Sequence, residues 1–138
     1  MAAGYSGTSL AKKLGVKPGM AVAVLDAPAD WSIPELPADV QTKRARRSSS
    51  AVKDVDVVIA FCRSRADVVA TRALVTVLGA SSALWVAWPR KAAGHMSDVT
   101  ENLLRELLLP TGLVDVKVAA LDNDWSGLKF VWRKENRR

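Results

Sequence analysis

The chain has 138 residues, of which 49% are hydrophobic and 25% are charged, and its formal net charge is +6. This length predicts a single domain over 1–138 that buries a real core, with flexible ends at 1–7 and 134–138. The longest apolar runs fall far short of the roughly 18 residues that cross a bilayer. The N-terminus has no continuous apolar core of the kind a secretory signal needs. We therefore expect a cytoplasmic protein that does not bind membranes.

The same composition disfavours disulfides and transition-metal sites. Cys62 is the single cysteine, so an internal disulfide and a cysteine-based zinc site are excluded. His95 is the single histidine, so other transition-metal sites are not expected.

The basic balance raises the question of nucleic-acid binding. Lysine and arginine cluster in "KRARR" at 43–47 and in "RKENRR" at 133–138, and such clusters can contact phosphates without reading sequence. However, the tryptophans lie in apolar runs or beside turns and do not interleave with these clusters. The chain also has no helix-turn-helix, zinc-finger or aromatic RNA-binding signature. We therefore do not expect nucleic acid to be the partner.

In chain order, the first half of the sequence predicts short elements, some from strong local patterns and some from weak ones. The segment 8–15 predicts a short helix with Thr8 as its cap and Gly15 as its end. Pro34 and Pro37 leave no room for a full helix between the first strand and the second. The remaining predictions are a strand at 20–25, a weak strand at 40–45, a polar loop at 46–54 and a buried strand at 55–62.

The second half has clearer periodicity. Apolar residues at helical spacing predict a helix over 64–79, with its buried face formed by Ala66, Val69, Ala70, Ala73, Leu74 and Val77. A strand at 83–88 places Trp85 and Trp88 on opposite faces. A second helix at 98–109 begins with Asp98 in capping-box spacing to Glu101. Strands at 114–121 and 128–134 then flank a turn.

The order strand, helix, strand, helix, strand predicts an α/β protein with a small, mostly parallel, Rossmann-like sheet and a C-terminal antiparallel hairpin. We expect strands 20–25 and 55–62 to be neighbours at its centre. The segment 26–40 gives the sheet little helical cover. Either its apolar residues Trp31, Ile33 and Leu36 cover that face, or an uncovered patch requires a partner. On this basis we hypothesise a homodimer.

Three motifs carry a family resemblance: "GYSGTSLAKKLGVKPG", "WVAWPRKAAG" and "PTGLVDVKVAALDNDWSGLKFV". Together they resemble a family of short bacterial proteins known as a domain of unknown function. That resemblance covers nearly the whole chain, with Ser9 where the family has proline, and it implies no established activity or cofactor. More distantly, "LGVKPGMAVAVLD" and the last two strands are similar to S-adenosylmethionine-dependent methyltransferases, which implies a methyltransferase-like fold.

Two features of such methyltransferases are missing here. Their first strand is followed by a glycine-rich turn, whereas this chain has "DAPADWS" after that strand, with Asp26 kept and Pro28 stiffening the turn. Their second strand ends in an acidic residue that holds the ribose hydroxyls, and here Lys43 and Arg44 stand in that region. We therefore expect no cofactor.

A ligand site in this class of fold lies outside the carboxyl ends of the parallel strands. Arg63, Ser64, Arg90 and Lys91 follow two of these ends and predict an anion-binding rim, in which Ser64 or Ser97 caps a helix N-terminus. The alternative is that these residues only solubilise loop ends.

Further candidates at the same edge are Asp26, Cys62, His95 and Trp125. Cys62 precedes a helix, where the helix dipole favours a thiolate, so a pair with His95 is conceivable. A buried cysteine acting as a small hydrophobic residue is the simpler interpretation. Trp125 stands in a turn, where it would cover a site or hold the hairpin.

Two functional classes follow. We favour a non-catalytic binding or regulatory domain on a degenerate methyltransferase-like scaffold, which recognises an anionic small molecule or a protein partner. The alternative is a divergent group-transfer enzyme of the S-adenosylmethionine-dependent methyltransferase type. The missing glycine turn and ribose-binding acid favour the first class, because a fold alone does not decide function.

Overall fold

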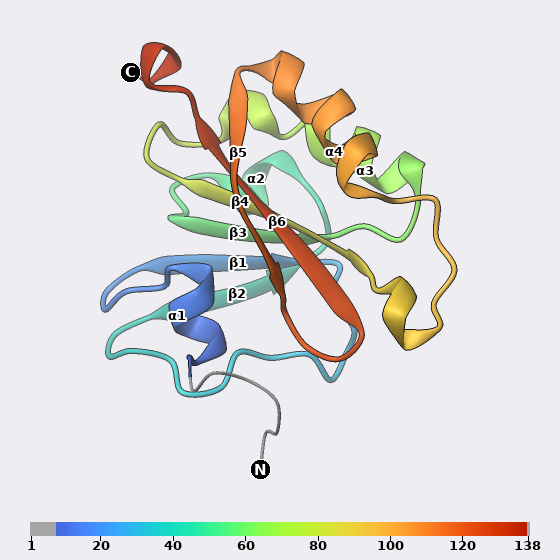
Figure 1. Ribbon diagram of the computed structural model, residues 1–138. Coiled ribbons are helices and arrows are strands. Elements are labelled where there is room, and N and C mark those ends of the chain that lie inside the picture. The colour runs from blue at the N-terminus through green and yellow to red at the C-terminus, as the bar shows by residue number, and fades with distance from the viewer. Residues whose placement is uncertain (1–7, 138) are drawn as a thin grey trace.

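The computed structural model describes residues 8–137, which form one six-stranded sheet with helices on both faces (Figure 1). The strands are β1 Ala21–Leu25, β2 Gln41–Ala45, β3 Val57–Phe61, β4 Ala83–Pro89, β5 Leu113–Ala120 and β6 Trp125–Trp132. The α-helices are α1 Leu10–Leu14, α2 Ser49–Val52, α3 Arg65–Arg72 and α4 Glu101–Leu108. Short 3-10 helices cover Val75–Val77, Lys91–Ala93, Leu109–Thr111 and Lys134–Asn136.

The strand order in the sheet is β2-β1-β3-β4-β6-β5. The first four strands pair in parallel, and β6 is antiparallel to both β4 and β5. This arrangement confirms the predicted α/β class, the C-terminal antiparallel hairpin and the parallel pairing of β1 with β3, although the centre of the sheet lies between β3 and β4. Consequently β5 runs in the same direction as β4, and the β5–β6 turn lies at the edge where the parallel strands end.

Burial follows from the position of each strand in the sheet. All five residues of β3 are buried, as expected for an apolar strand covered on both faces. In β2, an edge strand with the sequence QTKRA, none of the residues is fully buried. Its charged side chains suit an edge that has no further strand to pair with.

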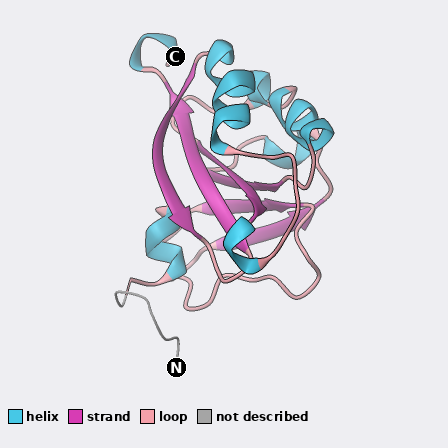
Figure 2. Ribbon diagram, turned by 45° about the vertical axis from the view of Figure 1, so that its right-hand side comes forward, coloured by secondary structure: helices cyan, strands magenta, loops and turns pink. Residues whose placement is uncertain are grey.

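The two faces of the sheet are covered unequally (Figure 2). One face packs against α2, α3 and α4, whose buried residues include Val52, Val68 and Leu104. Among residues 8–137, the other face is covered by α1 and the loop over 26–40, with Leu14 and Trp31 in its core. The N-terminal crossovers are therefore reduced, as predicted.

The two tryptophans of β4 belong to different cores. Trp85 is fully buried on the α1 face, where its indole Nε1 donates to Leu14 O at 3.1 Å. Trp88 lies in the core under α3 and α4. The predicted division of the two side chains between opposite faces is confirmed.

The helix predicted at 64–79 is too long, and five of the six residues of its predicted buried face are exposed; Leu74 alone of the six is buried as predicted. The helix α3 ends at Arg72, and its buried residues are Val68 and Thr71, whereas Ala66, Ala70 and Val69 are exposed. Thr71 can lie in the core because its hydroxyl donates to Asp67 O at 2.8 Å, so its polar group is satisfied.

Local details of other elements also differ from expectation. The cap of α1 is Ser9, which accepts from Lys12 N, and not Thr8. The cap of α4 is Thr100, which accepts from Leu103 N, and not Asp98. The predicted loop at 46–54 contains α2, and the last strand begins at Trp125. Which residue caps a helix depends on where the backbone enters the helix, and the residue type alone does not determine that position.

The ends of the chain and its apolar cover bear on two further expectations. The stretch 134–137, expected to be flexible, contains a 3-10 helix in which Asn136 Nδ2 donates to Gly112 O at 3.1 Å, and 1–7 and 138 lie outside the described residues. Trp31 and Ile33 are buried and cover the sheet, whereas Leu36 is exposed. The face whose exposure suggested a homodimer is therefore covered, and the homodimer stays a prediction.

Between residues 8 and 137 no helix is long and apolar enough to span a membrane. The cytoplasmic location stays a prediction.

Gly127→Ala tests the packing of the α1 face. A Cβ at Gly127 would lie 3.0 Å from Trp85 Cε3 and 3.1 Å from Leu121 Cγ, and both side chains are buried. We expect Gly127→Ala to lower the free energy of unfolding by about 1–2 kcal/mol through overpacking. Urea denaturation measures this change, with Ser126→Ala as the control. Equal stability of the two variants would show that the face is loosely packed.

Candidate functional site

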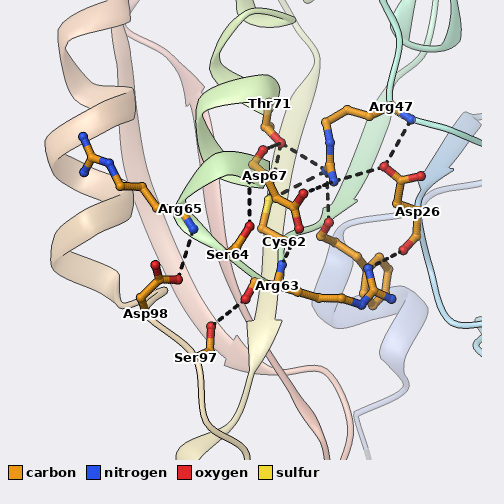
Figure 3. A network of polar contacts seen from close by, with 11 residues as sticks. Asp26, Arg47, Cys62, Arg63, Ser64, Arg65, Asp67, Thr71, Ser97 and Asp98 are labelled. Atoms are coloured by element: carbon orange, nitrogen blue, oxygen red, sulfur yellow. Dashed lines mark hydrogen bonds and ion pairs between the residues drawn. The ribbon is translucent and has the colours of Figure 1, made fainter.

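Arg47 is the centre of a polar network at the carboxyl ends of β1 and β3 (Figure 3). Its side chain is only 9% exposed, and its Nη2 lies 3.0 Å from Asp26 Oδ2 and 3.5 Å from Asp67 Oδ1. Its Nη1 donates to three acceptors: Phe61 O at 3.0 Å, Thr71 Oγ1 at 3.2 Å and Cys62 Sγ at 3.8 Å. One guanidinium thus connects the end of β1, the end of β3 and the helix α3.

Asp26 has a structural role in this network. Its backbone has a φ of +55°, a conformation that few non-glycine residues adopt. The carboxylate accepts the Arg47 backbone N–H at 3.3 Å as well as its side chain, and the carbonyl accepts Arg63 Nη1 at 3.0 Å. The ion pair and these hydrogen bonds support this strained conformation.

Cys62 is buried and chemically quiet. Its side chain has no exposed surface, and burial raises the pKa of the thiol to about 11. The helix N-terminus therefore does not produce a thiolate at neutral pH. His95 lies elsewhere, with Nε2 3.0 Å from Asp124 Oδ1. The structure thus pairs His95 with a carboxylate and Cys62 with Arg47 and Thr71.

The N-terminus of α3 is occupied by the chain's own acidic and hydroxyl groups (Figure 3). Ser64 Oγ accepts from Asp67 N at 3.3 Å, and Asp67 Oδ2 accepts from Arg63 N at 2.8 Å. Asp98 Oδ1 accepts from Arg65 N at 3.1 Å. Two carboxylates therefore already take the place that an external anion would have at this helix end.

The remaining residues of the predicted basic rim do not converge on one point. Arg90 Nη1 donates to Asp122 O at 3.2 Å and to Asn123 O at 3.3 Å, which ties the loop after β4 to the β5–β6 turn. Lys91 is exposed and makes no side-chain hydrogen bond or ion pair with the described residues. Ser97 Oγ donates to Arg63 O at 3.0 Å and so fastens the same loop to β3.

An open cleft of about 540 Å³ lies beside this network. It is bounded by the loop after β1, the segment that follows β3, the end of β4 with the loop that follows, and the β5–β6 turn. Its lining residues are Pro28, Asp30, Trp31, Arg63, Pro89, His95, Met96, Asp122, Asp124 and Trp125. All of these segments meet at the carboxyl edge of the sheet, where a ligand site was predicted.

Aromatic rings connect two walls of the cleft. The Phe61 ring packs edge to face against Trp31, with 4.9 Å between centroids, and against Trp125, with 4.8 Å between centroids. The Arg63 guanidinium lies over the Trp125 ring at 5.2 Å from its centroid. Phe61 is fully buried and Trp125 is half-buried, so Trp125 both anchors the hairpin and borders the cleft.

The charge of the cleft differs from the predicted rim. Three carboxylates, from Asp30, Asp122 and Asp124, face one arginine and one histidine. Asp122 Oδ1 accepts the backbone N–H groups of Asp124 and Trp125, each at 2.8 Å. Asp30 is exposed and makes no side-chain hydrogen bond or ion pair with the described residues.

Of the predicted site residues, Arg63, His95 and Trp125 line the cleft. Asp26, Cys62 and Ser64 belong to the Arg47 network beside it, and Arg90 and Lys91 lie in the adjoining loop. The carboxylates were missed, although "DNDW" at 122–125 offered a signal. A β5 strand parallel to β4 places that turn at the carboxyl edge.

Several solved structures have a similar arrangement of strands and helices. A SAM-dependent methyltransferase from Aquifex aeolicus is similar, with a TM-score of 0.59 at 13% identity, over 86% of this chain and 85% of that protein. The Methanococcus jannaschii fibrillarin pre-rRNA processing protein has a TM-score of 0.58 at 13% identity, over 85% and 68%. Aeropyrum pernix fibrillarin, solved with S-adenosyl-L-methionine, has 0.55 at 14%, over 88% and 73%.

The chain has a methyltransferase-like Rossmann fold. No protein-family model matches it, and no curated protein matches it either. The resemblance to a family of short bacterial proteins therefore stays a prediction. At these sequence identities the structural likeness shows the fold alone.

S-adenosylmethionine is the cofactor that this fold implies, and the residues at the ends of β1 and β2 do not fit it. Arg44 donates to Pro28 O at 2.7 Å and to Trp31 O, which fastens the turn after β1 onto β2. Asp26 is already paired with Arg47, and β2 runs into arginines instead of a ribose-binding carboxylate. Residues 8–137 also contain no group of His, Cys, Asp or Glu side chains placed to share a metal ion.

Arg47→Met tests the role of the network. The variant leaves two partly buried carboxylates without their cation, at 31% and 33% exposure. We expect a loss of about 2 kcal/mol in the free energy of unfolding, less than for a fully buried pair because water reaches both acids. Thermal unfolding measures it, and Arg46→Met, at an exposed position, is the control. If both variants unfold at the same temperature, the network is not a stability determinant.

Alkylation of Cys62 tests its protonation state. Because the folded pKa of about 11 lies above the ordinary value near 9, this burial stabilises the fold below pH 9 and the stabilisation is lost between about pH 9 and 11. At pH 7.5 we expect iodoacetamide to modify the folded protein at least about a hundredfold more slowly than the unfolded chain. Mass spectrometry over time gives both rates; comparable rates would contradict a buried thiol.

Proposed function

We propose that this protein is a non-catalytic binding domain of methyltransferase-like fold whose carboxyl-edge cleft holds a cationic group carried on an apolar stem. The observation that carries the proposal is the composition of the cleft: tryptophan rings and a methionine beside three carboxylates. The half-buried Trp125 and the exposed Met96 offer apolar contact to such a stem. The acids supply the opposite charge.

The non-catalytic part of the proposal rests on the state of the reactive groups. Cys62 is buried with a neutral thiol, and His95 is paired with Asp124. Neither arrangement provides a nucleophile with an adjacent base. Arg44 and Arg47 also hold the segments where the fold would otherwise receive its cofactor.

The predicted anionic ligand is less well supported at this site. An anion in the cleft would meet Asp30, Asp122 and Asp124, and Arg63 alone among the lining residues is permanently positive. The Arg63 guanidinium is also engaged by Asp26 O and the Trp125 ring. A lysine-like or arginine-like group fits the charges better, whether it belongs to a small molecule or to a protein partner.

The test uses butylguanidinium and butylammonium ions, with n-butylurea as the matched neutral probe. Titration followed by nuclear magnetic resonance of the indole N–H groups of Trp31 and Trp125 reports binding in the cleft. We expect the cations to bind and Asp30→Asn/Asp122→Asn to weaken them about tenfold, since each exposed ion pair contributes up to about 1 kcal/mol. Asparagine at 122 keeps the oxygen that accepts the turn N–H groups.

Controls and outcomes decide between the candidates. Asp54→Asn removes an acid from the loop between α2 and β3 and leaves cation binding unchanged. Equal binding of n-butylurea, or preferential binding of citrate, would contradict a cation site. A thermal shift with S-adenosylmethionine would instead support the group-transfer enzyme. A lysine-containing peptide that binds tighter than the free ions favours a protein partner over a small molecule.

A further inference from the structure

Two lysines of the β5–β6 pair lie beside the end of α1, at a place that no ligand hypothesis above uses. Lys117 in β5 and Lys129 in β6 are directly opposed partners in the antiparallel pair, so their side chains lie on the same face of the sheet. That face carries α1, which lies beside the β5–β6 pair (Figure 1). Lys17 follows the end of α1. We call Lys17, Lys117 and Lys129 the lysine patch.

The end of α1 positions the patch. Lys117 Nζ donates to Lys13 O in the last turn of α1 at 3.1 Å. The Lys129 ammonium lies over the left-handed Gly15 that ends the helix, 3.4 Å from where a Cβ on that glycine would be. Cations are favoured near the carbonyl end of a helix, which partly offsets their mutual repulsion.

The positive charges of the patch are not balanced by nearby acids. None of the three lysines forms an ion pair with a carboxylate of residues 8–137, and the undescribed positions 1–7 and 138 contain no Asp or Glu. The pKa of Lys129 is lowered by partial burial and then by the charges of Lys117 and Lys17. Opposed like charges in a sheet are unfavourable, so the fold keeps a repulsion here that an anion would relieve.

We propose that the lysine patch is a binding site for a phosphate-bearing anion of multiple charge. The ammonium groups of Lys117 and Lys129 at the end of α1, together with the nearby charge of Lys17, supply several donors and a concentrated positive field, which suits clustered phosphate oxygens. The site is independent of the cleft proposed above. The anion is either a free polyphosphate compound or the phosphate backbone of a nucleic acid, and both present the same chemistry to lysine.

The test compares Lys117→Gln/Lys129→Gln with a matched control, Lys43→Gln/Lys53→Gln. The control removes two exposed lysines, one from β2 and one after α2, and changes the net charge equally. Tripolyphosphate is titrated at constant ionic strength, and binding is followed by calorimetry. We expect affinity to fall at least about tenfold in the patch variant and less than twofold in the control.

A stability readout separates binding from a structural role. Without anion, we expect Lys117→Gln/Lys129→Gln to unfold at the same temperature as the parent protein or higher, because a repulsion is removed. With tripolyphosphate, the parent protein gains thermal stability and the patch variant does not. Equal loss of affinity in the two double variants would overturn the proposal, since net charge alone would then explain it.

Two further probes identify the source of the anion. A single-stranded RNA oligonucleotide whose binding loses about 1.4 units of salt dependence in the patch variant, about 0.7 for each lysine, indicates a nucleic-acid backbone. Tripolyphosphate binding without RNA binding indicates a small phosphorylated ligand. An acidic glutamate peptide that binds as tightly as tripolyphosphate, with the same sensitivity to the patch variant, would overturn the assignment to phosphate.

Discussion

The buried guanidinium of Arg47 is the interaction on which the carboxyl edge of this protein depends. A charge that is 9% exposed is tolerated because two carboxylates and three further acceptors surround it. Those partners come from the ends of β1 and β3 and from α3. The same group therefore supports the strained backbone at Asp26, fixes the start of α3 and fills space beside the turn after β1.

The Arg47 network changes which ligands the carboxyl edge of the sheet can accept. In a methyltransferase-like fold, the ends of the first strands and the adjoining helix N-terminus are natural sites for anions and cofactors. Here Asp67 and Asp98 accept the N–H groups around the start of α3, and Arg44 fastens the turn after β1. The open cleft instead lies toward the β5–β6 turn, and its lining contains carboxylates and aromatic rings. Uncompensated positive charge is found on the α1 face instead.

The sequence predicted the fold well because buried strands and turn residues leave strong local patterns. The apolar runs at β3 and β4, the breaks at proline and glycine, and the opposed faces of Trp85 and Trp88 were all available from it. The site was predicted less well. A cleft does lie at the predicted edge, but Arg63 and Arg90 contact backbone carbonyls, and the acids of the turn were overlooked.

The sequence by itself determined the α/β class, the parallel strands and the terminal hairpin. Periodicity and burial act within a few residues, so they can be recognised along the chain. Only the tertiary structure decided which charges meet. Asp26 and Arg47, which form an ion pair, are 21 positions apart, and the Lys117 ammonium donates to the backbone carbonyl of Lys13, 104 positions away. Such pairs depend on strand order and register, which no local pattern specifies, and they set the electrostatics of both proposed sites.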